Sequence, residues 1–173
     1  MPISLHSALV PNWLRLLSSC EGWLEKAEAF ANENGISEED MLDQRLIADM
    51  HPFTFQVKSM AMHSLGALEG VRAGSFSPDM APPPGSFSAL KARIGEASEG
   101  LKAVDEAEME GWIGKPMFFV AGQLRLEFTA EDFLLQFSQS NFHFHATMAY
   151  GILRAKGVPL GKRDFMGNLP IKR

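Results

Sequence analysis

Apolar residues recur at steps of three and four along four separate stretches of the sequence, and this spacing restricts the chain to a set of packed helices. An α-helix turns by ~100° per residue, so residues at these steps form one stripe along one side of the helix. The first stripe consists of Leu9, Trp13, Leu16, Leu17, Cys20, Leu24 and Ala27. Pro11 lies near the start, where a missing N–H costs little, and Asn34-Gly35 indicates the end. These residues predict one long first helix.

Two further long helices are predicted on either side of a proline-rich connection. The second helix is expected to begin around residues 49–52, with Asp49 as its N-cap, and to run to about Val71. Residues 73–86 include three consecutive prolines, which exclude a helix and favour an extended path. So long a crossover allows the helices on either side to run parallel. A third helix follows the capping Ser86, with the apolar residues Phe87, Leu90, Ile94, Ala97, Leu101 and Val104.

A different period marks residues 118–129, where Leu124, Leu126 and Phe128 alternate with polar residues around a central Ala-Gly. This alternation predicts a small β-hairpin. Thr129 then resembles the start of a capping box and opens a fourth helix, which Gly157 and Pro159 end. The apolar stripe of this helix is expected to contain Phe133, Phe137, Phe144, Met148 and Ile152.

Length and composition indicate one domain, spanning residues 1–173, because 173 residues that are 46% hydrophobic suffice for one full core. The net charge of −5 argues against a nucleic-acid partner, which would require a basic face. No segment approaches the ~18–20 apolar residues of a membrane span, and the first twenty residues lack the pattern of a signal peptide. We therefore expect a cytoplasmic protein without a membrane partner. The single cysteine, Cys20, is expected to pack as a small apolar side chain.

The fourth helix contains two histidines, His143 and His145, separated by one phenylalanine. Residues two apart on a helix point ~160° away from each other, so these two rings cannot share a ligand. A step of four residues closes to ~40°, which places Asn141 on the same side as His145. The expected apolar stripe puts Asn141 and His145 on or beside the buried face, whereas His143 faces outward.

Burying an amide and an imidazole without partners would cost roughly 1–3 kcal/mol each, so the fold must supply hydrogen bonds, a water or a metal. The candidate partners lie in the second helix. His51 is close in sequence to Asp49 and Gln56, and His63 follows Gln56 by seven residues on the same face. The sequence does not decide whether His51 or His63 faces His145. An ordinary hydrogen-bonded polar cluster is one interpretation, and a ligand or metal site is the other.

The segments DMHPFTFQVKSM, residues 49–60, and NFHFHATMAYGILRAKGVPLGKRDF, residues 141–165, together with the proline-rich crossover, resemble a group of bacterial proteins of unassigned function placed beside the DinB/YfiT-like bundles. The resemblance covers nearly the whole chain. It implies an all-α, DinB-like four-helix bundle, often dimeric, with a long crossover between helices 2 and 3. Here a small β-hairpin precedes helix 4.

Many DinB-like proteins hold a divalent metal with three histidines, one from the second helix and two spaced four apart on the last. Some of them use that metal for thiol-dependent transfer or isomerisation. In this sequence the four-residue pair reads Asn141 and His145, so one expected histidine is replaced by an amide, which is a poor ligand for zinc or nickel.

Two functions are consistent with these observations. The first is a non-catalytic homodimer that binds a small-molecule ligand or a protein partner, with a buried polar pocket around Asp49, Gln56, Asn141 and His145. The alternative is a divalent-metal-dependent enzyme, a thiol-dependent transferase, isomerase or hydrolase, in which His145 and His51 hold zinc or nickel. In that alternative, His63 is the other candidate ligand from the second helix.

Overall fold

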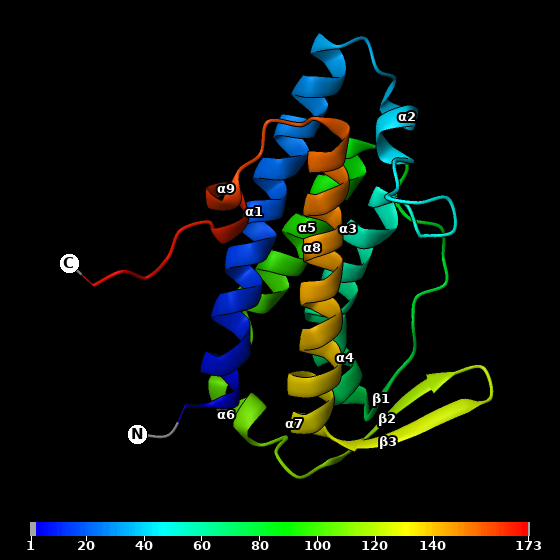
Figure 1. The fold of residues 1–173 in the computed structure, drawn as a ribbon. Helices are drawn as coiled ribbons and strands as arrows, with labels where there is room; N and C mark the ends of the chain where they lie inside the picture. Colours follow the sequence, from blue (N-terminus) through cyan, green and yellow to red (C-terminus); the bar gives the residue numbers. More distant parts are fainter. Residues whose placement is uncertain (1–2, 173) are drawn as a thin grey trace.

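The computed structural model describes residues 3–172, which fold into an elongated helical bundle with a small sheet at one end (Figure 1). Four helical rods run along the bundle: α1 (Leu5–Glu33), α3 with α4 (Phe53–Met62 and Leu65–Ala73), α5 (Phe87–Lys102) and α8 (Gln139–Lys156). Shorter helices connect or flank these rods: α2 (Glu38–Leu42), α6 (Glu106–Glu110), α7 (Ala130–Asp132) and α9 (Lys162–Met166). No helix within residues 3–172 is long and apolar enough to cross a membrane.

The first and third rods confirm the stripes predicted from the sequence. Every residue of the α1 stripe is buried, from Leu9 to Ala27, and Cys20 lies among them. Burial raises the pKa of the Cys20 thiol, so this side chain stays neutral in the core. In α5 the side chain of Ser86 accepts a hydrogen bond from the Ala89 N–H, as expected of a capping serine.

The second rod differs from its prediction at both its start and its middle. Its N-cap is Pro52, not Asp49, which is exposed in a turn. The rod also breaks at His63 and Ser64, so that α3 and α4 are two helices. Ser64 accounts for part of this break, because its hydroxyl donates to the backbone carbonyls of Met60 and Ala61 at 2.8 and 3.2 Å.

The fourth rod contains near its start a π-helical segment, η1 (Phe133–Ser138), which the spacing of the apolar residues did not predict. A π-turn inserts one extra residue, so the buried face downstream shifts by one position relative to a regular α-helix. The residue expected in the core, Phe144, is therefore 52% exposed, whereas Phe142 is fully buried against Trp13. The start of the rod agrees with prediction, since Thr129 caps the Asp132 N–H.

The predicted hairpin is confirmed as β2 (Pro116–Ala121) and β3 (Leu124–Thr129), which pair in antiparallel register with Phe119 opposite Leu126. A short third strand, β1 (Ser75–Phe76), runs parallel to β2. The element is therefore a three-stranded mixed sheet and not a hairpin alone. The hairpin extends beyond the side of the bundle (Figure 1).

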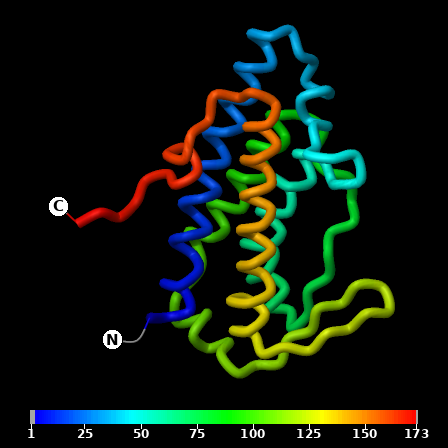
Figure 2. The backbone as a smooth tube through the Cα atoms, viewed as in Figure 1, coloured from blue at the N-terminus to red at the C-terminus, as the bar shows by residue number. Residues whose placement is uncertain are grey.

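The crossover after β1 returns along the length of the bundle and allows α3 with α4 and α5 to run parallel, as predicted (Figure 2). Lys58 of α3 fixes this segment, although its side chain is almost completely buried. Its ammonium donates to the backbone carbonyl oxygens of Asp79 at 2.8 Å and Ala81 at 2.5 Å, and it lies 3.1 Å from the Asp79 carboxylate. These three oxygens compensate for removing the ammonium from water.

Candidate functional site

The polar residues singled out in the sequence meet where α3 packs against α8. The two helices run in opposite directions (Figure 1), and two side-chain contacts join them. His145 Nδ1 lies 2.8 Å from Gln56 Oε1, and His63 Nδ1 lies 3.3 Å from Ser138 Oγ. The partners are seven residues apart on each helix, so both contacts belong to one antiparallel face.

Gln56 determines which ring nitrogen of His145 carries the proton. The Gln56 amide Nε2 donates to the His51 backbone carbonyl at 3.0 Å, so its oxygen faces His145. An amide oxygen only accepts, and His145 must therefore donate from Nδ1. The Nε2 atom of a neutral His145 is left as a hydrogen-bond acceptor.

The same argument applies to His63. The Ser138 hydroxyl donates to the His63 backbone carbonyl at 3.2 Å, which leaves its oxygen lone pairs for the ring. The His63 ring therefore donates from Nδ1 to Ser138, and its Nε2 is also an acceptor. Two unprotonated Nε2 atoms thus belong to neighbouring rings.

The environment keeps both imidazoles neutral. Their rings are nearly parallel, at 12°, with centroids 5.8 Å apart. Burial, together with the adjacent His145, lowers the pKa of His63 to about 3. Burial, together with the nearby His51, lowers the pKa of His145 to about 4. A charged ring here would lack both water and an opposite charge, so the pair remains unprotonated at neutral pH.

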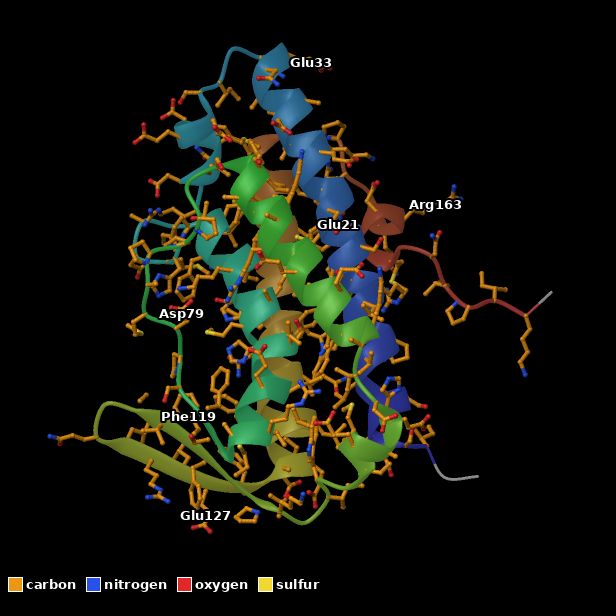
Figure 3. All side chains as sticks on the ribbon, turned by 180° about the vertical axis from the view of Figure 1, so that it is seen from behind. Glu21, Glu33, Asp79, Phe119, Glu127 and Arg163 are labelled. Carbon is orange, nitrogen blue, oxygen red and sulfur yellow. The ribbon has the colours of Figure 1, made fainter. Side chains whose placement is uncertain are left out.

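A cavity of about 280 Å³ lies between the start of α3 and the crossover, and neither His63 nor His145 lines it. Figure 3 shows Asp79 of the crossover next to the helix that carries Phe55. The Phe55 ring stacks on His51 at 3.8 Å and meets the edge of His145 at 5.9 Å, so one aromatic wall separates the cavity from the histidine pair. The cavity is lined by His51, Pro52, Phe55, Asp79, Met80, Ala81, Pro82 and Pro83.

The predicted pocket residues are only partly brought together. Gln56 and His145 are hydrogen-bonded, and His51 joins them through its backbone carbonyl and through Phe55. Asn141 is half-buried, but its amide donates to the Phe137 carbonyl of its own helix at 2.8 Å. Asp49 is exposed in the turn before α3 and does not take part in the contacts of Gln56.

His143 and His145 separate as the helix rotation predicts. His143 Nδ1 lies 2.9 Å from the Gln139 carbonyl oxygen on its own helix, whereas His145 turns toward α3. The prediction that Phe144 lies on the buried face was wrong. His145 nevertheless lies at the edge of that face and contacts α3.

The residues present do not fit a three-histidine metal centre. Within residues 3–172, no three histidine, cysteine, aspartate or glutamate side chains are grouped so that they could hold one ion. The Asn141 amide is engaged within its helix, and the His51 ring is stacked on Phe55. We therefore derive no chemistry from a bound metal.

Two contributors to the site were missed in the sequence, Ser138 and Phe55. Ser138 lies seven residues before His145, which is the same spacing that drew attention to His63 and Gln56. That spacing was a usable signal for a shared face. The sequence contains no comparable signal for Phe55, because its role depends on the position of the crossover.

The fold is that of a DinB-like helical bundle. A crystal structure of a DinB family member protein from Shewanella denitrificans superposes with a TM-score of 0.81 at 25% sequence identity, covering 98% of this chain and 95% of that chain. The model of the DUF1993 family, described as a domain of unknown function, matches residues 5–166. The chain belongs to the DUF1993 family. No curated protein matches it.

Proposed function

We propose that this protein is a ligand-binding bundle in which the cavity beside Phe55 takes a small aromatic or alicyclic molecule that carries a hydroxyl or amine group. The observation that supports this most directly is the stacked pair of rings, Phe55 and His51, that lines the cavity. A volume of about 280 Å³ is close to the lower end of small-molecule sites, which start at roughly 300 Å³.

The chemistry of the walls supports this class of ligand. Stacked rings of His51 and Phe55 and the crossover residues Pro82 and Pro83 offer apolar contact surface. The polar groups that line the cavity are the His51 ring and the Asp79 carboxylate, and a hydroxyl or amine group can donate a hydrogen bond to them. Lys58 holds the crossover in place, so one wall of the cavity is fixed before the ligand arrives.

The test is a titration with 2-naphthol, which combines an apolar double ring with one hydroxyl donor. Two-bond ¹H–¹⁵N spectra of the histidine rings report on each imidazole separately. We expect the resonances of His51 and His145 to move with saturation, whereas those of His143, on the opposite side of α8, remain in place. Phe55→Leu should weaken binding by about tenfold, the effect of losing one well-packed aromatic contact.

Phe144→Leu is the matched control, because Phe144 also contacts the His145 ring, at 5.3 Å, but does not line the cavity. It should bind 2-naphthol like the wild type. Histidine spectra that stay unchanged at saturating probe, or equal weakening by Phe55→Leu and Phe144→Leu, would rule out this cavity as the binding site.

We also propose that this protein is a homodimer. In support, the hairpin extends beyond the bundle (Figure 1). On its strand β3, Leu124 is 52% exposed and Leu126 is 39% exposed. Apolar residues grouped on a projecting element are typical of protein contacts. Light scattering should give twice the chain mass, and Leu126→Lys should give the monomer. Leu46→Lys is the control, because Leu46 is a comparably exposed leucine in the loop between α2 and α3, and this variant should remain a dimer.

A further inference from the structure

A second cavity, of about 280 Å³, lies on the opposite side of the molecule from the crossover, between α1 and the C-terminal segment. Figure 3 shows Arg163 on α9, which lies against α1. We call this space the Arg15 cavity. It is lined by Arg15, Ser18, Ser19, Gly22, Trp23, Lys26, Arg163, Asp164, Gly167 and Asn168.

The charges of the Arg15 cavity are opposite to those of the whole chain. Three of its residues are basic, Arg15, Lys26 and Arg163, in a protein with a net charge of −5. The one acid, Asp164, is already engaged, because its carboxylate lies 2.6 Å from Lys26 Nζ and accepts the Gly161 N–H. These contacts hold the pKa of Asp164 below its usual range, so its charge offsets only one cation.

Hydrogen-bond donors in the cavity are also left over. Arg15 uses one N–H for the Met166 carbonyl, and a guanidinium has five. The Arg163 side chain makes no hydrogen bond or ion pair within residues 3–172. Ser19 is only 8% exposed, yet its buried hydroxyl has no partner among the described residues. Buried hydroxyls are rarely left unpaired, and this one lines a cavity, from which a ligand can supply the partner.

The C-terminal segment is placed tightly enough to form a wall of this cavity. Gly167 adopts φ 60° and ψ −154°, a conformation restricted in practice to glycine. A Cβ built at Gly167 would lie 2.6 Å from Ser19 Oγ. The Trp23 indole N–H donates to the Asp164 carbonyl at 3.0 Å, which anchors the same segment.

We propose that the Arg15 cavity binds the phosphate group of a small soluble molecule. Arg15 and Arg163 supply the charge and the planar N–H groups that phosphate oxygens accept, Ser18, Ser19 and Asn168 add neutral donors, and Trp23 supplies an apolar wall for the remainder of the molecule. This site is independent of the cavity beside Phe55 and of the ligand proposed there.

Phenyl phosphate, with inorganic phosphate alongside, is the probe. In ¹⁵N-labelled protein, the indole N–H of Trp23 and the amide of Gly167 should shift and saturate with either compound. Arg163→Gln should weaken binding by about tenfold, the cost of one charge-assisted contact, and Arg15→Gln by more. Arg125→Gln, on the distant hairpin, is the matched control and should bind like the wild type.

Arg15→Gln also removes the contact to Met166, so its unfolding curve is recorded beside the titration. Arg163→Gln is the decisive variant, because this substitution removes no hydrogen bond or ion pair of the folded protein. No shift at Trp23 with either phosphate, or equal affinity in Arg163→Gln and Arg125→Gln, would overturn the proposal. Co-sedimentation with phosphatidic acid vesicles that depends on Arg163, without binding of phenyl phosphate, would overturn the soluble ligand in favour of a lipid headgroup.

Discussion

Two serines of the second helical rod, Ser59 and Ser64, are both fully buried, but only one of them has a hydrogen-bond partner. Ser64 donates to Met60, whereas the Ser59 hydroxyl has no partner among the described residues. An unpaired buried hydroxyl costs roughly 1–3 kcal/mol. Ser59→Ala should therefore raise the free energy of unfolding by about 1 kcal/mol in urea denaturation.

Ser64→Ala is the counterpart, because it removes a hydroxyl that has a partner. It should lower the free energy of unfolding by about 1 kcal/mol. Equal signs for Ser59→Ala and Ser64→Ala would contradict the assignment of one paired and one unpaired serine.

The neutral histidine pair makes the stability depend on pH. His63 and His145 titrate near 6.5 when unfolded, but near 3 and 4 when folded. Between these values the unfolded chain binds more protons, so stability is complete above pH ~6.5 and falls as the pH is lowered through the window. At pH 5 the free energy of unfolding should be lower than at pH 7.5 by about 2 kcal/mol for each ring.

Urea denaturation at the two pH values measures this difference. His145→Gln should remove about half of it and keep the contact to Gln56 available. Thr147→Ala, at an exposed position on the same helix, should keep all of it. A pH dependence that His145→Gln leaves unchanged would show that this ring is accessible to protons in the folded protein.

The π-helical segment of the fourth rod yields a prediction at the level of the helix. Deleting Leu135, which is 41% exposed within η1, should convert the π-turn to a regular α-turn and leave α8 in its register. We expect a folded protein whose free energy of unfolding is lower by less than about 2 kcal/mol.

Deleting Thr147 instead removes a residue from regular α-helix. It rotates everything downstream by ~100°, which moves Ile152 and Leu153 out of the core. This variant should lose most of its stability, and circular dichroism during heating distinguishes the two. Similar melting of both variants would show that η1 does not hold an extra residue.

The sequence predicts correctly those helices in which the spacing of the apolar residues is uninterrupted. The stripes of α1 and α5 were correct because no residue breaks their period. The stripe of α8 failed at Phe144 because one inserted residue upstream changes the rotation of all that follows. The two-residue strand β1 was missed because it depends on pairing with β2, more than forty residues later along the chain, and has no local signal.

For the molecule as a whole, the sequence predicted the DinB-like bundle but only part of the candidate site. Helix rotation was enough to separate His143 from His145. His145 contacts Gln56 and stacks on His63. Both contacts depend on the position of α3 along α8, which the sequence of neither helix determines alone. The cavity beside Phe55 depends in addition on Lys58, which binds the crossover.

The C-terminal segment closes the bundle over α1 and α8, and this closure should contribute measurably to stability. Phe165 of α9 stacks on Trp23 of α1, with ring centroids 5.6 Å apart, and meets the edge of Tyr150 of α8 at 5.5 Å. Phe165→Ala should lower the free energy of unfolding by about 2 kcal/mol, less than for a fully buried phenylalanine because Phe165 is half-buried.

Phe144→Ala removes the same atoms from a side chain that is 52% exposed, so its effect should stay within about 0.5 kcal/mol. Loss of Phe165 should also shift the tryptophan emission to longer wavelength in the folded protein, since Trp23 gains contact with water, and Phe144→Ala should leave it unchanged. Equal stability of the two variants would mean that α9 rests on the bundle without stabilising it, because the apolar area that Phe165 shares with Trp23 would then be offset by the entropy lost in ordering the segment.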